Sequence, residues 1–201
     1  MEPGPPTTNR LEAFSDGIFA VAATLLVLDL GVDTAHHSLA RALGAEWPHY
    51  ATYVVSFITI GIIWLNHHAA FDRIENPDRT LLVLNLILLM FVTLTPFPTR
   101  LLGAYIRSSG DEHIAAAVYA ATMLAMSVSF FSTYLWAAHR RLFVQWIGEE
   151  QARYLVRRNV RGLFVYAAAI GVAFASAPAS LAMCGAVALY YLHPGRPLQP
   201  G

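Results

Sequence analysis

Residues 10–30 read RLEAFSDGIFAVAATLLVLDL, and this stretch decides the fold. A helix needs about 20 mostly apolar residues to cross the hydrocarbon layer of a bilayer. Two acids, Glu12 and Asp16, stand at one end of the stretch, which is then apolar as far as Asp29. It predicts a transmembrane helix over residues 11–32 with two carboxylates near one membrane face.

The composition of the whole chain agrees with a membrane protein. Of its 201 residues, 56% are apolar and 13% are charged, whereas soluble domains carry about 25% charged residues. A soluble fold could not keep that much apolar surface off its exterior. We expect an all-α fold, a polytopic bundle of six transmembrane helices. The expected spans are residues 11–32, 49–71, 80–102, 113–138, 160–176 and 178–192, between tails at 1–10 and 193–201.

The last two spans come from one apolar block, residues 160–192, which Pro178 interrupts. As one helix the block would be about 50 Å long, too long for one span and marginal for two. We expect a hairpin of two short helices; one tilted helix with a re-entrant end is the alternative. The preceding connection, residues 139–159, mixes charges with helix-spaced apolar residues and predicts an interfacial helix on the inner leaflet.

Arginine placement predicts the orientation, because basic residues in short loops stay cytoplasmic. Of the 13 basic residues, three fall in the segments on the outer side, namely Arg41, Arg100 and Arg107. The other ten share the side of the amino terminus: Arg10, Arg73, Arg79, Arg140, Arg141, Arg153, Arg157, Arg158, Arg161 and Arg196. Both termini are therefore expected in the cytoplasm, and the protein in the cell (plasma) membrane.

Several functional classes are disfavoured by the sequence. The formal net charge is zero, which argues against a nucleic-acid partner because phosphate binding needs clustered positive charge. The single cysteine, Cys184, fits no disulfide or metal spacing. The chain has no GxSxG elbow, no Gly-rich phosphate loop and no TVGYG carbonyl filter. We expect neither an enzyme nor an ordinary potassium channel.

A helical wheel divides the first span into two faces. One face is an apolar seam with a single hydroxyl, formed by Phe14, Gly17, Val21, Thr24 or Leu25, and Leu28. The other face carries Glu12 and Asp16 with the small residues Ala20 and Ala23, which let neighbouring helices approach closely. Because an ionised carboxylate inside a membrane is costly unless paired or wetted, we expect the acidic face to be buried within its own subunit.

Polar residues of the next two spans lie at the depth of these acids. The second span ends in Trp64-Leu65-Asn66-His67-His68, and the third begins near Asn85. We expect a hydrogen-bonded cluster of Arg10, Ser15 and Asp16 with one histidine and one or both asparagines. Three roles remain open for it: support of the helix register, proton-linked gating, and a metal or catalytic site.

The metal role has the weakest support in the sequence. Adjacent helical residues point about 100° apart, so His67 and His68 can hardly ligate one ion. The spacings HxxxH and HExxH are absent as well. No metal site is expected.

Four blocks of sequence resemble one known family. Arg10-x-x-x-Phe14-Ser15-Asp16, followed by TLLVLDL at residues 24–30, closely resembles the signature of the transmembrane-protein-175 potassium channels, in their six-helix prokaryotic branch. Three later blocks are similar to the second and third helices of that family: Trp64-Leu65-Asn66-His67-His68, Leu84-Asn85-Leu86 and Thr95-Pro96-Phe97-Pro98-Thr99. The resemblance extends over residues 10–102 and is architectural beyond them.

The resemblance implies a homotetramer whose first helices line a central cation pathway. In such channels apolar side chains of the first helix form the constriction, which corresponds here to Val21, Leu25 and Leu28, with Thr24 as a pore-lining hydroxyl. The implied polar network, which would support the first helix during gating, comprises Arg10, Phe14, Ser15, Asp16, Trp64, Asn66, His67, His68 and Asn85. If the seam lines a pore, Asp29 would concentrate cations at its mouth.

The expected function is a potassium-permeable cation channel, weakly selective for potassium over sodium, which closes when water leaves its apolar constriction. Its expected partners are its own copies, the lipid bilayer and monovalent cations; no cofactor is expected besides the permeant potassium ion. Val21 stands where the family more often has Ile or Leu, which would widen the innermost ring. The alternative is a proton-coupled secondary cation transporter with Asp16 and His67 or His68 as its relay.

Overall fold

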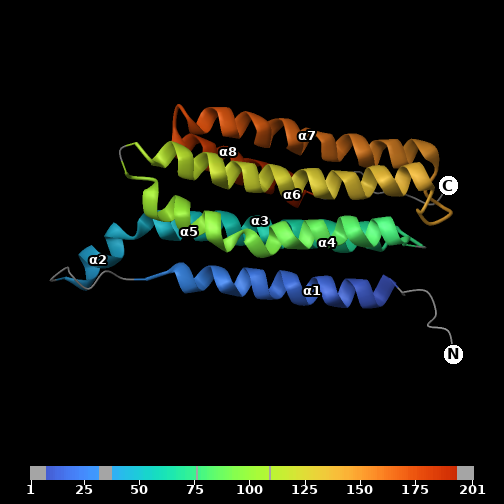
Figure 1. Ribbon diagram of the computed structural model, residues 1–201, viewed down its shortest axis with the longest axis horizontal. Helices are drawn as coiled ribbons and strands as arrows, with labels where there is room; N and C mark the ends of the chain where they lie inside the picture. The colour runs from blue at the N-terminus through green and yellow to red at the C-terminus, as the bar shows by residue number, and fades with distance from the viewer. Residues whose placement is uncertain (1–7, 32–37, 76, 109, 194–201) are drawn as a thin grey trace.

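The chain folds into a bundle of helices that lie roughly parallel to one long axis, as Figure 1 shows. A computed structural model describes residues 8–31, 38–75, 77–108 and 110–193. Within these residues the regular structure is helical and includes no strand, and this confirms the predicted all-α class.

The helices follow the chain with short connections. The helical segments are α1 (Thr8–Leu25), the 3₁₀ segment η1 (Leu26–Asp29), α2 (Leu39–Ala45), α3 (Trp47–Phe71), α4 (Arg79–Leu94), α5 (Pro96–Tyr105), α6 (Glu112–Arg140), α7 (Glu149–Ala173) and α8 (Ala177–Leu192). In Figure 1, α1 lies along one side, α3 to α5 form the middle, and α6 to α8 cover the far side. Accordingly, α1 contacts α3 and α4, which in turn contact α8 and α6.

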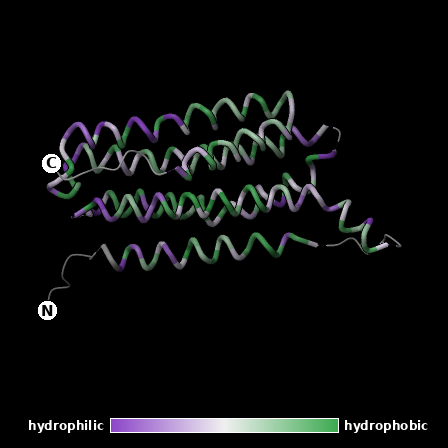
Figure 2. The backbone as a smooth tube through the Cα atoms, turned by 180° about the vertical axis from the view of Figure 1, so that it is seen from behind, coloured by the Kyte–Doolittle hydropathy of each residue, from purple (hydrophilic) through white to green (hydrophobic). Residues whose placement is uncertain are grey.

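In the part of the chain that the structure describes, four segments are long and apolar enough to cross a membrane: Arg10–Asp29, Trp47–Phe71, Arg79–Tyr105 and Glu112–Arg140. The shorter helix α8, Ala177–Leu192, is also apolar. In α7 the charged residues are concentrated before Gly162, and its apolar part follows. Figure 2 shows hydrophilic residues gathered at the start of α7 and apolar residues along the middle of the bundle.

Proline and capping residues determine where several helices begin and end. Pro96 and Pro98 lack the amide hydrogen that a continuous helix needs, and the chain breaks between α4 and α5 at Thr95. Asp78 caps α4 by accepting a hydrogen bond from the Leu81 amide at 2.8 Å. The Trp136 indole also donates to the Asp78 carboxylate at 3.0 Å, so the start of α4 is fixed against α6.

Two expectations about helix boundaries differ from the structure. Helix α1 already begins at Thr8, within the expected tail; residues 1–7 and 194–201 lie outside the described part. The expected interfacial helix at 139–159 is not a separate element. Helix α6 ends at Arg140, Arg141 takes a left-handed conformation with φ 54°, and α7 then runs without a break from Glu149. Leu155 is buried, which anchors the first turns of α7 to the bundle.

The main core lies where α3, α4, α6, α7 and α8 meet, around the buried side chains of Ile60, Leu88, Tyr119 and Met123. Helix α1 contributes Phe19 and Ala22 to it, and η1 contributes Leu26. Hydroxyl groups inside this core pair with one another: Ser56 bonds to Thr99 at 2.7 Å and to Tyr119 at 3.0 Å. The core therefore holds α1 along one stripe and leaves the rest of that helix uncovered.

The first helix and its polar network

The buried stripe of α1 consists of residues three or four positions apart. Ser15, Phe19, Ala22 and Leu26 are each at most 3% exposed, and the spacing keeps them on one side of the helix. Small side chains at two of the four positions let α1 approach α3 and α4 closely. This stripe defines how α1 is rotated about its axis.

The predicted apolar seam lies on the uncovered side of α1. The exposed fractions are 54% for Val21, 41% for Leu25 and 74% for Leu28. Gly17 and Thr24 on the same side are also exposed. The Thr24 hydroxyl donates to the Val21 carbonyl at 2.9 Å, which leaves its oxygen free to accept from outside the helix. An unpartnered apolar stripe, which we call the α1 stripe, therefore extends along α1 and into η1 in the single chain.

A directional chain of hydrogen bonds ties α1 to α3 and α4. His67 Nε2 lies 2.8 Å from Asn85 Oδ1, and Asn85 Nδ2 donates to Ser15 Oγ at 3.0 Å. The Ser15 hydroxyl in turn donates to the Leu11 carbonyl at 2.9 Å. All three side chains are buried. The structure thus selects His67, rather than His68, as the histidine in the network.

Aromatic rings enclose the His67 imidazole. The Phe71 ring stacks on it with centroids 4.4 Å apart, and the Phe19 ring meets it edge-on at 5.3 Å. Because the Asn85 amide nitrogen is used toward Ser15, its oxygen accepts from His67 Nε2–H. The other ring nitrogen, Nδ1, is buried without a hydrogen-bond partner among the described residues. This environment holds the imidazole in one tautomer.

The acidic face of α1 is less buried than expected. Asp16 and Ala20 are exposed, and Glu12 and Ala23 are half-buried. The Trp64 indole donates to Asp16 Oδ1 at 2.8 Å across the rim of a groove between α1 and α3. The small residues that face the core are Ser15 and Ala22, which lie about 100° around the helix from Asp16. The Asp16 carboxylate therefore lies at the edge of the contact between α1 and α3.

Other predicted members of the network lie apart from it. Arg10 and Phe14 are exposed, and Arg10 has no hydrogen bond or ion pair with another described residue. Asn66 donates instead to the Ile62 carbonyl at 2.8 Å and to the Tyr191 carbonyl at 3.3 Å, which joins α3 to α8. His68 pairs with Asp72, their Nε2 and Oδ2 atoms lying 3.7 Å apart.

At the other end of the first span, Asp29 has a basic neighbour. The Arg100 Nε atom of α5 lies 4.0 Å from Asp29 Oδ1, and the Asp29 side chain is 18% exposed. This pairing reduces the negative field that Asp29 alone would give to a pore mouth.

Sequence reasoning did not single out Phe19, Phe71 or Asp72. A spacing signal was nevertheless available for each, because one helical turn brings residues four positions apart to the same face. Phe19 follows Ser15, Phe71 follows His67 and Asp72 follows His68 at that interval. The first two extend the buried network, and the third belongs to a different cluster at the end of α3.

Comparisons with known proteins agree with this architecture. The family model described as "Endosomal/lysosomal potassium channel TMEM175" matches residues 10–96. A potassium channel of Streptomyces collinus is 46% identical to this chain, over 92% of this chain and 91% of that protein. An endosomal/lysosomal proton channel TMEM175 of Gallus gallus is 32% identical over 74% of this chain, which spans 32% of that protein.

A solved structure is similar over nearly the whole length. The crystal structure of a lysosomal potassium-selective channel TMEM175 homologue from Chamaesiphon minutus superposes with a TM-score of 0.82 at 34% identity, covering 92% of this chain and 96% of that one. The similarity includes the later helices, where sequence motifs gave only an architectural resemblance.

Proposed function

Because the chain belongs to the TMEM175 family of channels, we propose that it is a potassium-permeable cation channel whose pore is lined by α1 from four copies. It is a multi-pass membrane protein, and as a member of a channel family it is not an enzyme. The observation that carries the pore assignment is the exposed stripe of α1, which is opposite the face that holds this helix to its own subunit.

The stripe suits a pore constriction closed by side chains. Val21, Leu25 and Leu28 follow one another by about one turn and all project away from the bundle core. Four copies around one axis would form three apolar rings, and a narrow apolar tube loses its water and excludes ions. The position of α1 at the side of the bundle (Figure 1) leaves it accessible to other copies.

The buried network gives α1 a fixed support during gating. Ser15 is bonded through Asn85 to His67, so the amino-terminal half of α1 is tied to α3 and α4. The half that carries the stripe contacts the core through Ala22 and Leu26, and Asp29 Oδ1 at its end lies 4.0 Å from Arg100 Nε of α5. Opening would therefore spread or rotate the helix against the restraint of this network at one end and of the Asp29–Arg100 pair at the other.

A weak preference for potassium over sodium would follow from this pore. An apolar ring offers no ligands in exchange for the water that an ion loses, so the ion that holds its hydration less tightly passes more easily. The exposed Thr24 oxygen adds one polar contact per subunit at the same level. No cofactor takes part besides the permeant ion.

The arginine distribution supports an orientation with both termini in the cytoplasm of the cell. The hydrophilic start of α7 lies at the same end of the bundle as the start of α1, as Figures 1 and 2 show. Basic residues therefore gather at one face of the bundle, which suits the cytoplasmic face of the plasma membrane.

The transporter alternative needs a proton relay between Asp16 and a histidine. The Asp16 carboxylate bonds instead to the Trp64 indole, and His67 bonds to Asn85. No hydrogen bond joins Asp16 to either histidine among the described residues. The geometry favours a passive pore over a relay.

Recording from the purified protein in planar bilayers tests the proposal. Under a potassium gradient at equal pH, we expect currents that reverse near the potassium equilibrium potential. These currents should need no proton gradient. Reversal near the proton equilibrium potential would show that protons carry the current. The Gallus gallus relative is named a proton channel. Saturable flux coupled to protons would assign it to the transporter class.

Crosslinking tests the assembly separately. The only natural cysteine, Cys184, is buried at 1% exposure, so a single introduced cysteine reports its own surroundings. Val21→Cys should give covalent dimers when treated with a short thiol crosslinker in membranes, because each chain then has one accessible thiol and can form one crosslink. Leu189→Cys, at a residue that is 55% exposed on α8, is the matched control and should stay monomeric. Monomers from both would contradict a pore lined by α1.

A further inference from the structure

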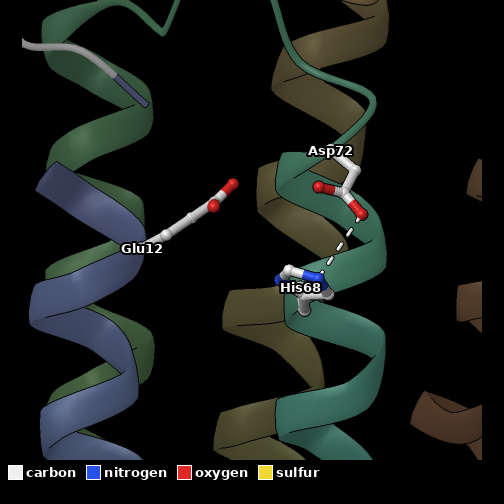
Figure 3. Close-up of side chains that lie close together, drawn as sticks. All are labelled: Glu12, His68 and Asp72. Atoms are coloured by element: carbon white, nitrogen blue, oxygen red, sulfur yellow. Dashed lines mark ion pairs between the residues drawn. The ribbon is translucent and has the colours of Figure 1, made fainter. Parts of the chain in front are cut away.

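Three side chains with metal-binding atoms meet between α1 and α3. They are Glu12 from α1, His68 from α3 and Asp72 from the C-cap of α3, and one ligand atom from each lies within 4.8 Å of the other two. Figure 3 shows the Glu12 side chain reaching across from α1 toward the His68–Asp72 pair, which a dashed line joins. The cluster is separate from the buried network, to which His67 contributes from the next position on α3.

A contact one turn away sets the register of this cluster. Asp16 lies four residues after Glu12, and Trp64 lies four residues before His68, and these two are joined by the 2.8 Å hydrogen bond. Because the helices are antiparallel neighbours here, this bond places Glu12 opposite His68. Glu12 and His68 are thus positioned by two helices, and Asp72 by the C-cap at the end of α3.

The charges in the cluster favour a cation. Two carboxylates face one imidazole, and no arginine forms an ion pair with Glu12 or Asp72 among the residues that the structure describes. His68 and Asp72 are exposed and Glu12 is half-buried, so an ion can enter from the water at this end of the bundle. An imidazole nitrogen with two carboxylate oxygens is a ligand set that suits zinc-like transition metals better than calcium or magnesium, which prefer oxygen alone.

We propose that Glu12, His68 and Asp72 bind one divalent transition-metal ion, of the Zn²⁺ class, at the amino-terminal end of α1. Three protein ligands and a water complete a tetrahedral site. Ligand atoms around Zn²⁺ lie about 2.0–2.2 Å from the metal, so the three side chains need to close by about 1 Å through rotamer adjustment. The i, i+4 spacing of His68 and Asp72 on one helix face makes this adjustment local.

The bound ion would link α1 to α3. In the channel proposed above, on which this consequence rests, opening requires α1 to move relative to its own subunit. A metal that joins Glu12 to α3 adds a bond that such movement must break or stretch. Zn²⁺ would therefore hold the channel closed, acting on the helix at a position outside the apolar constriction.

Calorimetric titration of ZnCl₂ into the purified full chain in detergent tests the binding. We expect saturable binding of one Zn²⁺ per chain. Glu12→Gln, His68→Asn and Asp72→Asn should each weaken it by at least about tenfold, since even groups behind the ligands commonly change metal affinity by 10–100-fold. His139→Asn is the matched control: it removes an exposed histidine near the end of α6 that belongs to no such cluster among the described residues.

The outcomes separate this site from the channel function. Binding that is unchanged in all three variants, or is lost equally in His139→Asn, overturns the site. Potassium flux into liposomes that Zn²⁺ reduces in the wild type and not in Glu12→Gln supports the link between α1 and α3. If Glu12→Gln loses Zn²⁺ binding but its potassium flux responds to Zn²⁺ as that of the wild type does, the link between α1 and α3 is overturned. The metal site itself is then still supported. Absence of flux without metal contradicts the channel proposal, while the titration still decides the site.

Discussion

At the level of single residues, the buried chain from His67 through Asn85 to Ser15 joins three helices with two side-chain hydrogen bonds. Each group in it uses a donor or acceptor that would otherwise be unsatisfied in the core. The rings of Phe19 and Phe71 exclude other partners from the imidazole. Asn85 is the central member, because its amide bonds on both sides.

Removing Asn85 should therefore destabilise the fold. Asn85→Ala leaves the His67 Nε2–H and the Ser15 oxygen without partners, and an unsatisfied buried polar group costs about 1–3 kcal/mol. Thermal unfolding followed by size-exclusion chromatography in detergent measures the loss. Asn159→Ala is the control, since its amide bonds to the Leu155 carbonyl of its own helix at 2.9 Å and its loss should have a smaller effect. Equal stability of the two variants would contradict a network role for Asn85.

The Asp16–Trp64 bond makes a different prediction, because it lies at an exposed rim. Asp16→Ala removes the acceptor and should lower the unfolding temperature by about 2–4 °C, as a loss of about 1 kcal/mol does in a chain of this size. Asp16→Asn keeps an amide oxygen in the place of Oδ1 and should recover much of the loss. A stable Asp16→Ala tetramer with altered ion selectivity would show that Asp16 faces the ion pathway instead.

These residues also show how far sequence reasoning reaches. It identified Ser15, Asn85 and a histidine as one cluster, because their helices place them at the same depth. It could not choose between His67 and His68, since adjacent positions differ by about 100° and the rotation of α3 depends on packing that involves Phe19 and Phe71. For the same reason it placed Asp16 on the buried side, whereas the side chains of α1 that are fully buried include Ser15 and Ala22, both at 0% exposure.

At the level of elements, α3 and α5 lie in close contact at Gly103. A Cβ atom added there would lie 2.8 Å from His49 Nδ1 and 3.0 Å from Thr52 Oγ1. The Thr52 hydroxyl is buried and donates to the Pro48 carbonyl at 3.0 Å, so it has little freedom to move. The absence of a side chain at Gly103 therefore sets the distance between the two helices.

Gly103→Ala should separate α3 from α5 and cost about 1–3 kcal/mol, as overpacking of a well-filled core does. Gly171→Ala on α7 is the matched control, because a Cβ atom there meets no atom within 4 Å. Alanine also favours a helix interior over glycine, so the control should be neutral or slightly stabilising. Unfolding temperatures of the two variants in the same detergent decide the matter, and a neutral Gly103→Ala would mean that His49 and Thr52 yield easily.

Element boundaries depended on local chemistry in some places and on packing in others. The break near Pro96 and Pro98 follows from the missing amide hydrogens, and it was visible in the sequence. The charged start of α7 was read as a separate interfacial helix because its composition differs from that of the following apolar part. In the structure the Gly148 amide donates to the Gln151 side chain at 3.0 Å, which caps the start of α7. Leu155 is buried, and the charged part continues into the apolar part as one helix.

At the level of the whole molecule, the single chain leaves the α1 stripe without a partner. The helical wheel was sufficient to place Val21, Leu25 and Leu28 on one face, because helix periodicity alone determines that. It did not show whether the face meets lipid or other copies of the chain. In a membrane, lipid and protein are both apolar surroundings for such a face, so hydrophobicity does not distinguish them.

Ion flux distinguishes these surroundings, because a residue that faces lipid has no effect on permeation. Leu25→Ala or Leu28→Ala should widen an apolar ring, keep it hydrated and raise passive potassium flux into liposomes; a barrier lowered by about 1.4 kcal/mol raises the flux about tenfold. Leu189→Ala is the control, since this leucine is equally apolar and 55% exposed on α8. It should leave the flux unchanged. If all three variants conduct like the wild type, the stripe faces lipid, and another helix must line the pore.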